Sequence, residues 1–438
     1  MTKMRALGAA AAATTLFLLQ AGMAMAQDGA PPAVDGAATA WVLTSSALVL
    51  FMCLPALALF YGGLVSARNV LSVFTQCAAI ASLASLLWLA VGYSLAFGDG
   101  AGLNAVIGGF GKVMLAGVDP ASQVGRLPET VFFLFQLTFA TITPVLIVGA
   151  YPERMSFGPT LGFSGLWLLL VYVPVTHWIW GGGWLASLGV LDFAGGIVVH
   201  TTAGVSALVI AIMLGARRGF PRETRPPHSP GMTYSGAAML WVGWFGFNGG
   251  SALAADGSAG MAIIVTHTAA AAASLTWMAI EMVRFGRPSM VGLVTGTIAG
   301  LATVTPASGF VGPWGGLVCG VAGGAVCFEA VQIVKMRLKI DDSLDVFAVH
   351  GVGGMLGSLL LAGLMLPSLG GLGLKEGVSA LDQLGLQALG VAAVALWSVV
   401  ATFVILRVLR LFSPLRVSQQ DEIEGLDLTI HGERAYEL

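Results

Sequence analysis

Two stretches of this sequence, DFAGGIVVH at residues 192–200 and DVFAVH at residues 345–350, share an aspartate, a phenylalanine and a closing Val-His in apolar surroundings. Their similarity is a faint internal repeat, with one copy in each half of the chain. The repeat puts His200 and His350 at equivalent positions of two apolar segments. Because ionisable side chains inside a bilayer are costly, both histidines are functional candidates.

The composition indicates a membrane protein. Of the 438 residues, 57% are hydrophobic and only 10% are charged, whereas soluble domains carry about a quarter charged residues. This excludes a soluble globular protein. A net charge of −2, with no basic run outside short loops, excludes a nucleic-acid-binding surface. The many glycines inside apolar stretches suit membrane helices that pack closely in a lipid bilayer.

The apolar segments predict the fold class. A membrane span needs about 20 mainly apolar residues, and after residue 26 the chain offers eleven such segments, centred near residues 53, 84, 140, 168, 206, 243, 271, 298, 324, 357 and 397. Eleven divides into five plus five plus one, and two halves of five spans must be inverted relative to each other. We predict an all-α polytopic membrane protein with eleven transmembrane helices, a transmembrane domain at 27–410 and a cytoplasmic tail at 411–438.

The charged residues and the amino-terminal segment predict the orientation. Most lysines and arginines fall in alternate connections and in the tail, and such residues favour the cytoplasmic side. The mature amino terminus should lie outside and the carboxyl terminus inside, in the cytoplasmic (inner) membrane. Residues 1–26 resemble a signal peptide, with Lys3 and Arg5 before an apolar run and Ala24-Met25-Ala26 as the cleavage site. An uncleaved first helix is the alternative.

Few ionisable residues fall within or beside the predicted spans. For a single intramembrane histidine, structural hydrogen bonding is as good an explanation as function, but two histidines at equivalent positions of a repeat favour function. A metal site, as in an intramembrane metalloenzyme, is the sharper alternative, although no cysteine or HxxxH partner stands near either histidine. The four cysteines show no metal-ligand spacing and are expected in the core. The candidates are His200, His350, Glu329, Asp192 and possibly His267.

Three aromatic clusters accompany these residues. In WFGFNGGS at residues 244–251, Trp244, Phe247 and Ser251 fall on one helical face. A second cluster is QLTF at residues 136–139, and a third is HWIWGGG at residues 177–183. Tryptophan at the end of a span is often only an interfacial anchor, which is the alternative for Trp180.

With these stretches, the chain resembles the ammonium transporter family. The resemblance covers essentially the whole mature chain and rests on GGG at 181–183, DFAGG with His200, WFGFN at 244–248, VTPA at 304–307, and DVF with His350-Gly351. It implies transport of ammonium or ammonia, neither enzymatic activity nor a cofactor, and a homotrimer with one pore in each subunit.

The resemblance also implies residue roles. It makes Trp180, Phe139 and Ser251 the outer ammonium site, with Asp192 beneath it as an organiser and a favourable charge for a cation. An N-cap role for Asp192 is compatible with this. The other implied roles are a pore gate of Phe139 and Phe247, pore-lining His200 and His350, and supporting Trp244, Thr305 and Gln136.

The energetics of a buried ion favour passage as ammonia, because a free ion in a low-dielectric medium costs tens of kcal/mol. One alternative function is an ammonium sensor with an occluded pore, and another is a Rhesus-type gas channel, although proteins of that type lack the aromatic cation site. The acidic tail would be disordered by composition. Its EGLD at 424–427 and HGE at 431–433 instead resemble the family's ordered tail, which docks a PII-type nitrogen regulatory protein.

Overall fold

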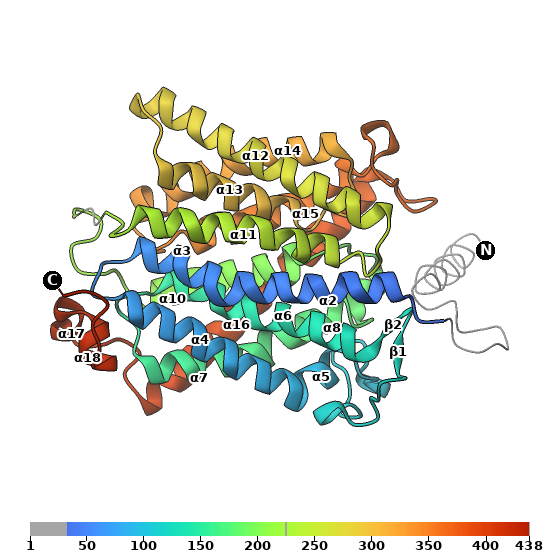
Figure 1. Ribbon diagram of the computed structural model, residues 1–438, viewed down its shortest axis with the longest axis horizontal. Helices are drawn as coiled ribbons and strands as arrows, with labels where there is room; N and C mark the ends of the chain where they lie inside the picture. Colours follow the sequence, from blue (N-terminus) through green and yellow to red (C-terminus); the bar gives the residue numbers. More distant parts are fainter. Residues whose placement is uncertain (1–32, 224–225, 438) are drawn as a thin grey trace, which may run out of the picture.

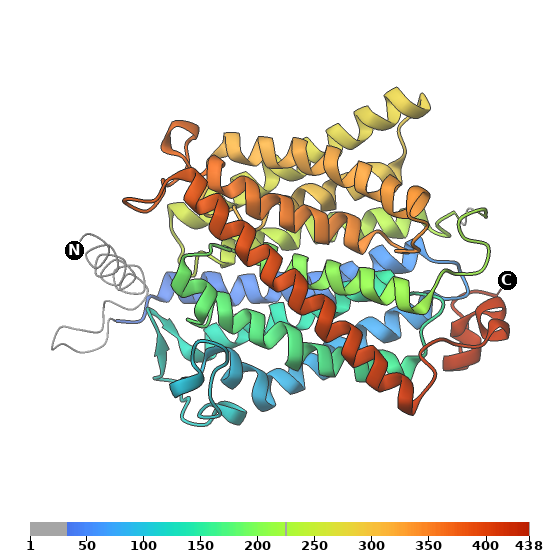
Figure 2. The same cartoon turned by 180° about the vertical axis from the view of Figure 1, so that it is seen from behind.

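A computed structural model describes residues 33–223 and 226–437 of the chain. The predicted signal peptide at 1–26 lies outside these residues. Long helices run side by side along the molecule and form one bundle (Figures 1 and 2). The α-helices are α2 (Gly36–Phe51), α3 (Leu57–Leu64), α4 (Val70–Leu87), α5 (Tyr93–Phe97), α6 (Glu129–Ile147), α7 (Phe157–Trp167), α8 (Val173–Ile179), α9 (Trp184–Leu188), α10 (Thr202–Leu214), α11 (Pro230–Gly250), α12 (Gly257–Phe285), α13 (Met290–Val304), α14 (Pro313–Gln332), α15 (Val352–Leu364), α16 (Ala380–Phe412), α17 (Gln419–Glu424) and α18 (Leu426–His431).

Several helices are joined end to end by π-helical turns, in which the backbone widens by one residue. The strand content of the described residues is one short antiparallel pair, β1 (Gln123–Val124) with β2 (Leu127–Pro128), in a connection at the end where α2 begins. The π-helical turns are η1 (Met52–Ala56), η2 (Trp88–Gly92), η6 (Leu168–Tyr172), η7 (Gly196–Thr201), η8 (Ile333–Arg337) and η9 (Phe347–Gly351).

Local sequence explains where the long helices begin. Asp35 caps α2 by accepting from the N–H groups of Ala37 and Ala38, each at 3.0 Å. Asp256 and Ser289 cap α12 and α13 in the same manner, and α16 opens with a reciprocal capping box around Ser379. Such caps satisfy N–H groups that the first helical turn leaves without an intrahelical acceptor.

Nine helical segments in the described part of the chain are long and apolar enough to cross a membrane. Two further segments predicted as spans, near residues 243 and 298, coincide with α11 and α13. Helix α11 has 21 residues but is not among the nine, and α13 is apolar but has only 15 residues. The helical, polytopic membrane class is therefore confirmed.

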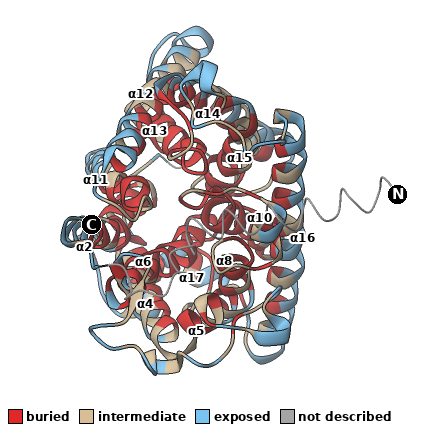
Figure 3. Ribbon diagram, turned by 90° about the vertical axis from the view of Figure 1, so that its right-hand side faces the viewer, coloured by how far each residue is buried: buried red, intermediate tan, exposed pale blue. Residues whose placement is uncertain are grey.

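Buried residues gather inside the bundle and exposed residues lie on its outer surface (Figure 3), and many of the exposed residues are apolar. Leu86, Leu275 and Leu396 are examples of exposed leucines on three different spans. An outward apolar surface is expected where lipid replaces water as the solvent. All four cysteines are buried with free thiols, as the sequence predicted.

The carboxyl-terminal tail folds back against one end of the bundle, opposite the start of α2 (Figure 1). Helices α17 and α18 lie there, and the backbone of Arg416 pairs with that of Met155. The Leu426 N–H donates to the Asn69 side chain at 2.8 Å, and the Ser72 N–H donates to the Asp427 carboxylate at 2.7 Å. The tail thus contains two short helices, the last ending at His431, and it docks on the bundle, as the family resemblance implied and its acidic composition did not.

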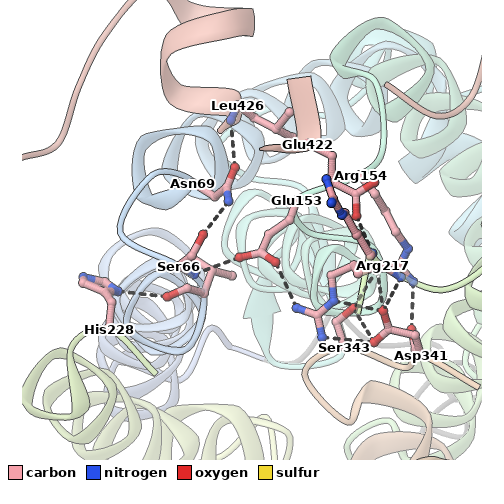
Figure 4. Close-up of polar contacts among 12 residues, drawn as sticks. Ser66, Asn69, Glu153, Arg154, Arg217, His228, Asp341, Ser343, Glu422 and Leu426 are labelled. Carbon is pink, nitrogen blue, oxygen red and sulfur yellow. Dashed lines mark hydrogen bonds and ion pairs between the residues drawn. The ribbon is translucent and has the colours of Figure 1, made fainter. Parts of the chain in front are cut away.

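A buried charge cluster lies beneath the tail (Figure 4). Arg217 makes two hydrogen bonds to the Asp341 carboxylate, at 2.9 and 3.0 Å, and a third at 3.1 Å to Glu153. Arg154 is fully buried and donates to the Asp341 carbonyl at 2.7 Å and to the Ser343 hydroxyl at 2.6 Å. Burial alone would raise the pKa of Asp341, but the charges of Arg217 and Arg154 outweigh it and lower this pKa to about 2. The cluster ties together connections that are far apart in sequence.

Candidate functional site

The two histidines of the internal repeat meet in the centre of the bundle. His200 lies in η7 and His350 in η9, and their Nδ1 atoms are 3.3 Å apart. Both side chains are buried, with 1% and 4% exposure. In this Nδ1 to Nδ1 contact one ring must donate and the other accept, so one remaining Nε2 is an acceptor and the other carries a proton. The pair therefore offers one hydrogen-bond donor and one acceptor.

An aspartate caps each of the two histidine-bearing turns. Asp192 accepts from the N–H groups of Gly195, Gly196, Ile197 and Val198 at 2.7 to 3.0 Å. Four donors fill the lone-pair positions of a carboxylate.

Asp342 does the same work for the second turn. Its carboxylate accepts from Val346, Phe347 and Ala348 at 3.1, 2.8 and 3.4 Å. The repeat seen in the sequence aligned Asp345 with Asp192, but the structure makes Asp342 the counterpart. The missed signal was spacing, since both capping aspartates stand eight residues before their histidine.

Glycines let the two histidine-bearing segments cross closely. A Cβ added to Gly204 would lie 2.3 Å from the Gly351 Cα, and one added to Gly354 would lie 2.5 Å from the Gly196 carbonyl oxygen and 2.7 Å from the His200 Cβ. Any larger side chain would therefore push the segments, and the imidazoles they carry, apart. The close helix packing expected from glycines inside apolar stretches is confirmed at these positions.

A narrow cavity lies against the histidine pair. Its volume is about 10 Å³, which is roughly the minimum for one water-sized molecule. Apart from the imidazoles, the walls are apolar or aromatic. The lining residues are Met52, Leu57, Phe60, Ile142, Leu146, Val199, His200, Leu240, Trp244, Phe247, Ile298 and His350.

Aromatic rings close the cavity on one side. The rings of Phe139 and Phe247 are 4.4 Å apart between centroids, and Phe139 meets Trp180 edge to face at 5.7 Å. The Phe247 ring also lies 6.1 Å from that of His200. The predicted gate residues thus stand between Trp180 and the histidine pair, in contact with each other.

Hydrogen bonds fix the remaining aromatic side chains. The Trp180 indole N–H donates to the Asp192 carbonyl at 2.8 Å, which links the tryptophan to the capped turn below it. The Trp244 indole N–H donates to the Thr305 hydroxyl at 2.8 Å, and the Trp244 ring stacks on His200 at 5.4 Å. The Ser251 hydroxyl donates to the Phe247 carbonyl one helical turn away, at 2.8 Å.

The other candidates are placed differently. Gln136 is buried one helical turn before Phe139 on α6, and its side-chain oxygen has no hydrogen-bond partner among the described residues. Glu329 forms an exposed ion pair with Arg284, and His267 packs against Trp241 on an exposed part of α12. These last two are therefore outside the central site. Among residues 33–223 and 226–437 no group of three His, Cys, Asp or Glu side chains is arranged to hold a metal ion.

A second, wider cavity follows on the other side of the histidine pair, and sequence analysis did not anticipate it. Its volume is about 190 Å³, and its lining includes Ser343, Lys335 and Asp345. His350 is shared with the narrow cavity, as are Phe60 and Ile298. The histidines thus stand between an aromatic side and a wider polar vestibule, which is the arrangement of a path for a very small solute.

Comparisons with known proteins show to which family the chain belongs. The model of the Ammonium Transporter Family matches residues 40–436. The chain is 46% identical to an ammonium transporter of Bacillus subtilis, over 89% of this chain and 96% of that protein. It is 42% identical to ammonium transporter Amt1 of Archaeoglobus fulgidus, over 91% of this chain and 98% of that protein. The crystal structure of Saccharomyces cerevisiae Mep2 superposes with a TM-score of 0.81 at 36% identity, covering 89% of this chain and 91% of that one. This chain belongs to the ammonium transporter family.

Proposed function

We propose that this protein carries ammonium across the cytoplasmic membrane by binding it at Trp180, removing one proton and conducting mainly ammonia past His200 and His350. Membership of the family supports ammonium transport as such. The observation that carries the finer proposal is the pair of buried imidazoles, 3.3 Å apart, beside a cavity with room for one small molecule.

The proposal follows from the cost of moving an ion through such a cavity. Transfer of an unpaired ion into a low-dielectric medium costs tens of kcal/mol, and the apolar wall offers no counter-charge. Amines titrate roughly two to three pH units above neutrality, so deprotonation costs only about 3 to 4 kcal/mol. Ammonia is therefore the cheaper species to move. One Nε2 donor and one Nε2 acceptor match a solute that both accepts and donates hydrogen bonds.

The aromatic side of the site suits recognition of the cation before its proton is lost. A cation against the Trp180 ring gains about 0.5 to 2 kcal/mol, which selects a cation without holding it firmly. Phe139 forms the other wall of this outer site, and the Ser251 hydroxyl oxygen remains available to accept from ammonium. Asp192 acts by holding the turn that positions Trp180, because backbone amides already fill its carboxylate. Potassium has no proton to release, so this route excludes it chemically.

We further propose eleven spans, arranged as two inverted halves of five plus one, with the mature amino terminus outside and the tail inside. The support is that α11 and α13 fall at the two remaining predicted spans. The start of α2 and the tail also lie at opposite ends of the bundle, as an odd number of crossings requires (Figure 1). On this orientation Trp180 faces the outside and the wider vestibule faces the cytoplasm.

Partners are proposed on the same basis. We propose a homotrimer with one pore in each subunit, and a PII-type nitrogen regulatory protein that binds at the face formed by the docked tail. The ordered α17 and α18 support a protein-binding role for this face. A pull-down in which a PII-type protein fails to bind would remove this partner.

The decisive experiment is electrophysiology on solid-supported membranes carrying the purified protein. We expect an ammonium-dependent current that potassium does not replace, and loss of this signal in the variant His200→Ala with His350→Ala. An ammonium sensor with an occluded pore is the alternative function, and one structural relative is described as a sensor Amt protein, at 31% identity and a TM-score of 0.83. A sensor would bind ammonium without passing current, so the absence of both current and pH change would refute transport.

A further inference from the structure

The wider vestibule contains one lysine and one aspartate that face each other. The Lys335 Nζ lies 2.8 Å from Asp345 Oδ1 and 3.2 Å from the Ser343 carbonyl oxygen. Their side chains are 23% and 20% exposed, and both line the cavity that ends at His350. A solute that passes the histidines therefore enters a space whose lining charges are this pair.

The chemistry of the lysine head group resembles that of the transported cation. A lysine ammonium is a compact, strongly hydrated charge with three N–H donors, and ammonium differs from it by one further N–H in place of the carbon stem. Lys335 Nζ contacts a carboxylate and a carbonyl oxygen, the two kinds of acceptor that a free ammonium ion would seek. The lysine thus occupies a position suited to ammonium itself.

The aspartate is held in place at a cost. Asp345 has φ of +62°, a left-handed conformation that is uncommon for residues other than glycine. Such conformations persist where the surrounding structure requires them and cluster at functional sites. The Asp345 N–H donates to the Asp342 carbonyl at 3.1 Å, so the strained residue is fixed directly to the aspartate that caps η9.

Asp192 and Asp345, on the two sides of the pore, differ in the groups that bind their carboxylates. Four backbone N–H groups fill the Asp192 carboxylate. Asp345 instead faces Lys335, while Arg217 and Asp341 add their charges from neighbouring segments and Asp342 interacts with it electrostatically. Without Lys335, this half-buried carboxylate would face the vestibule with no counter-cation in contact, and burying an uncompensated charge is unfavourable.

We propose that Lys335 is a built-in substitute for ammonium, which fills the Asp345 site so that ammonium formed again below His350 is released instead of bound. Its role is to keep the cytoplasmic side of the pore free of a product-binding site. The part of this inference that concerns release rests on the proposed function. The part that concerns occupancy of the carboxylate does not, because it can be tested by cation binding alone.

The inference predicts a new cation site when the lysine is removed. Lys335→Met leaves Asp345 and the Ser343 carbonyl oriented toward an empty position, which a monovalent cation of ammonium size can enter. A proton is the competing occupant, because a buried carboxyl without a counter-charge also gains stability by protonation. Binding must therefore be measured directly and not inferred from transport.

The first test is crystallography of the protein with rubidium, which is close to ammonium in size and scatters anomalously. We expect anomalous density beside Asp345 in Lys335→Met, and none there in the wild type, in Lys335→Arg or in Lys335→Met with Asp345→Asn. Lys339→Met is the matched control, since Lys339 is exposed and does not line the cavity. Should Lys335→Met fail to fold, Lys335→Gln is read by the same criteria.

The second test measures inhibition from the cytoplasmic side in oriented proteoliposomes. A charged hydrogen bond is worth about a tenfold change in affinity, so half-inhibition of inward current should need about tenfold less internal ammonium in Lys335→Met than in the wild type. Lys339→Met should match the wild type, and adding Asp345→Asn to Lys335→Met should restore the wild-type value.

Two results overturn the inference. One is rubidium density beside Asp345 in the wild type equal to that in Lys335→Met. The other is no density in Lys335→Met together with unchanged internal inhibition, which would mean that a proton or solvent fills the position. Failure of the proposed function gives a different result, because the wild type itself would then pass no ammonium current. The rubidium experiment would still show whether a cation binds beside Asp345 when Lys335 is replaced.

Discussion

Replacing Asp192 by asparagine should separate an organising role from a proton-accepting one. The carboxylate accepts two N–H groups on each oxygen, those of Gly195 and Gly196 on Oδ1 and those of Ile197 and Val198 on Oδ2. In Asp192→Asn an NH₂ group replaces one oxygen, and in either orientation two backbone donors lose their acceptor.

The size of the effect follows from these bonds. Hydrogen bonds to a charged acceptor are worth about 1.5 to 3 kcal/mol each, so losing two destabilises the folded state by roughly 3 to 6 kcal/mol. The turn that carries His200 should loosen, and so should the carbonyl that holds the Trp180 indole. We expect a lower midpoint of thermal unfolding in detergent and loss of the ammonium current.

Two further variants make the experiment decisive. Asp256→Asn is the matched control, because Asp256 is an exposed helix cap and asparagine caps helices as well as aspartate does. Asp192→Glu keeps a carboxylate that could take a proton but is too long to meet four amides, so it should be as inactive as Asp192→Asn. An active Asp192→Glu, or an Asp192→Asn variant that melts like the wild type, would refute the organising role.

Three other changes have clear expected outcomes. Replacing His200 and His350 together by leucine removes the polar groups that hydrogen-bond ammonia, and each lost hydrogen bond is worth about 1 kcal/mol. The ammonium current should fall by roughly an order of magnitude or more. An unchanged current with intact selectivity would contradict this expectation. Phe247→Ala removes the ring whose centroid lies 4.4 Å from that of Phe139 in the gate and should admit water and potassium, measured as a potassium current that the wild type lacks. Asp341→Asn leaves the buried Arg154 without its carboxylate partner and should destabilise the protein by about 3 to 5 kcal/mol. Since the folded-state pKa of Asp341 is lowered to about 2, its stabilisation is complete above the unfolded-state pKa of about 4 and is lost as the pH falls from there through the folded-state pKa. The wild type and the variant should therefore converge in unfolding midpoint at low pH.

Much of the architecture could be predicted from the order of residues. Hydrophobic segments of sufficient length have few alternatives to helices in a bilayer, because every backbone polar group must be satisfied internally. The same reasoning identified His200 and His350, since a polar residue in such a segment is expensive and rarely accidental. The sequence placed Trp180, Phe139 and Phe247 in aromatic clusters, but their roles came only from family resemblance, because an aromatic residue near a span end is equally typical of an interfacial anchor.

Three features required the tertiary structure. Asp342 could not be recognised from sequence similarity, because the repeat pairs Asp345 with Asp192. Capping depends instead on how far the carboxylate stands from the first amide groups of the turn, and Asp342 has that spacing. The vestibule was missed because Lys335 and Asp345 belong to different segments, and Lys335 looked like one more basic residue on the cytoplasmic side. Composition alone pointed to a disordered tail, whereas family resemblance implied an ordered one. The structure shows why the tail can dock: Asp427 accepts from the Ser72 N–H and Glu422 from the Arg218 N–H, both more than 200 residues earlier.

The sequence by itself therefore determined that the chain is a helical membrane protein with two special histidines, because hydropathy and the cost of buried polar groups act locally along the chain. Only the tertiary structure decided that the two imidazoles touch and that aromatic rings stand on one side of them. It also decided that, on the other side, Lys335 pairs with the Asp345 carboxylate. These contacts depend on how glycine-lined helices cross, and the distance between two crossing helices is not encoded in either segment alone.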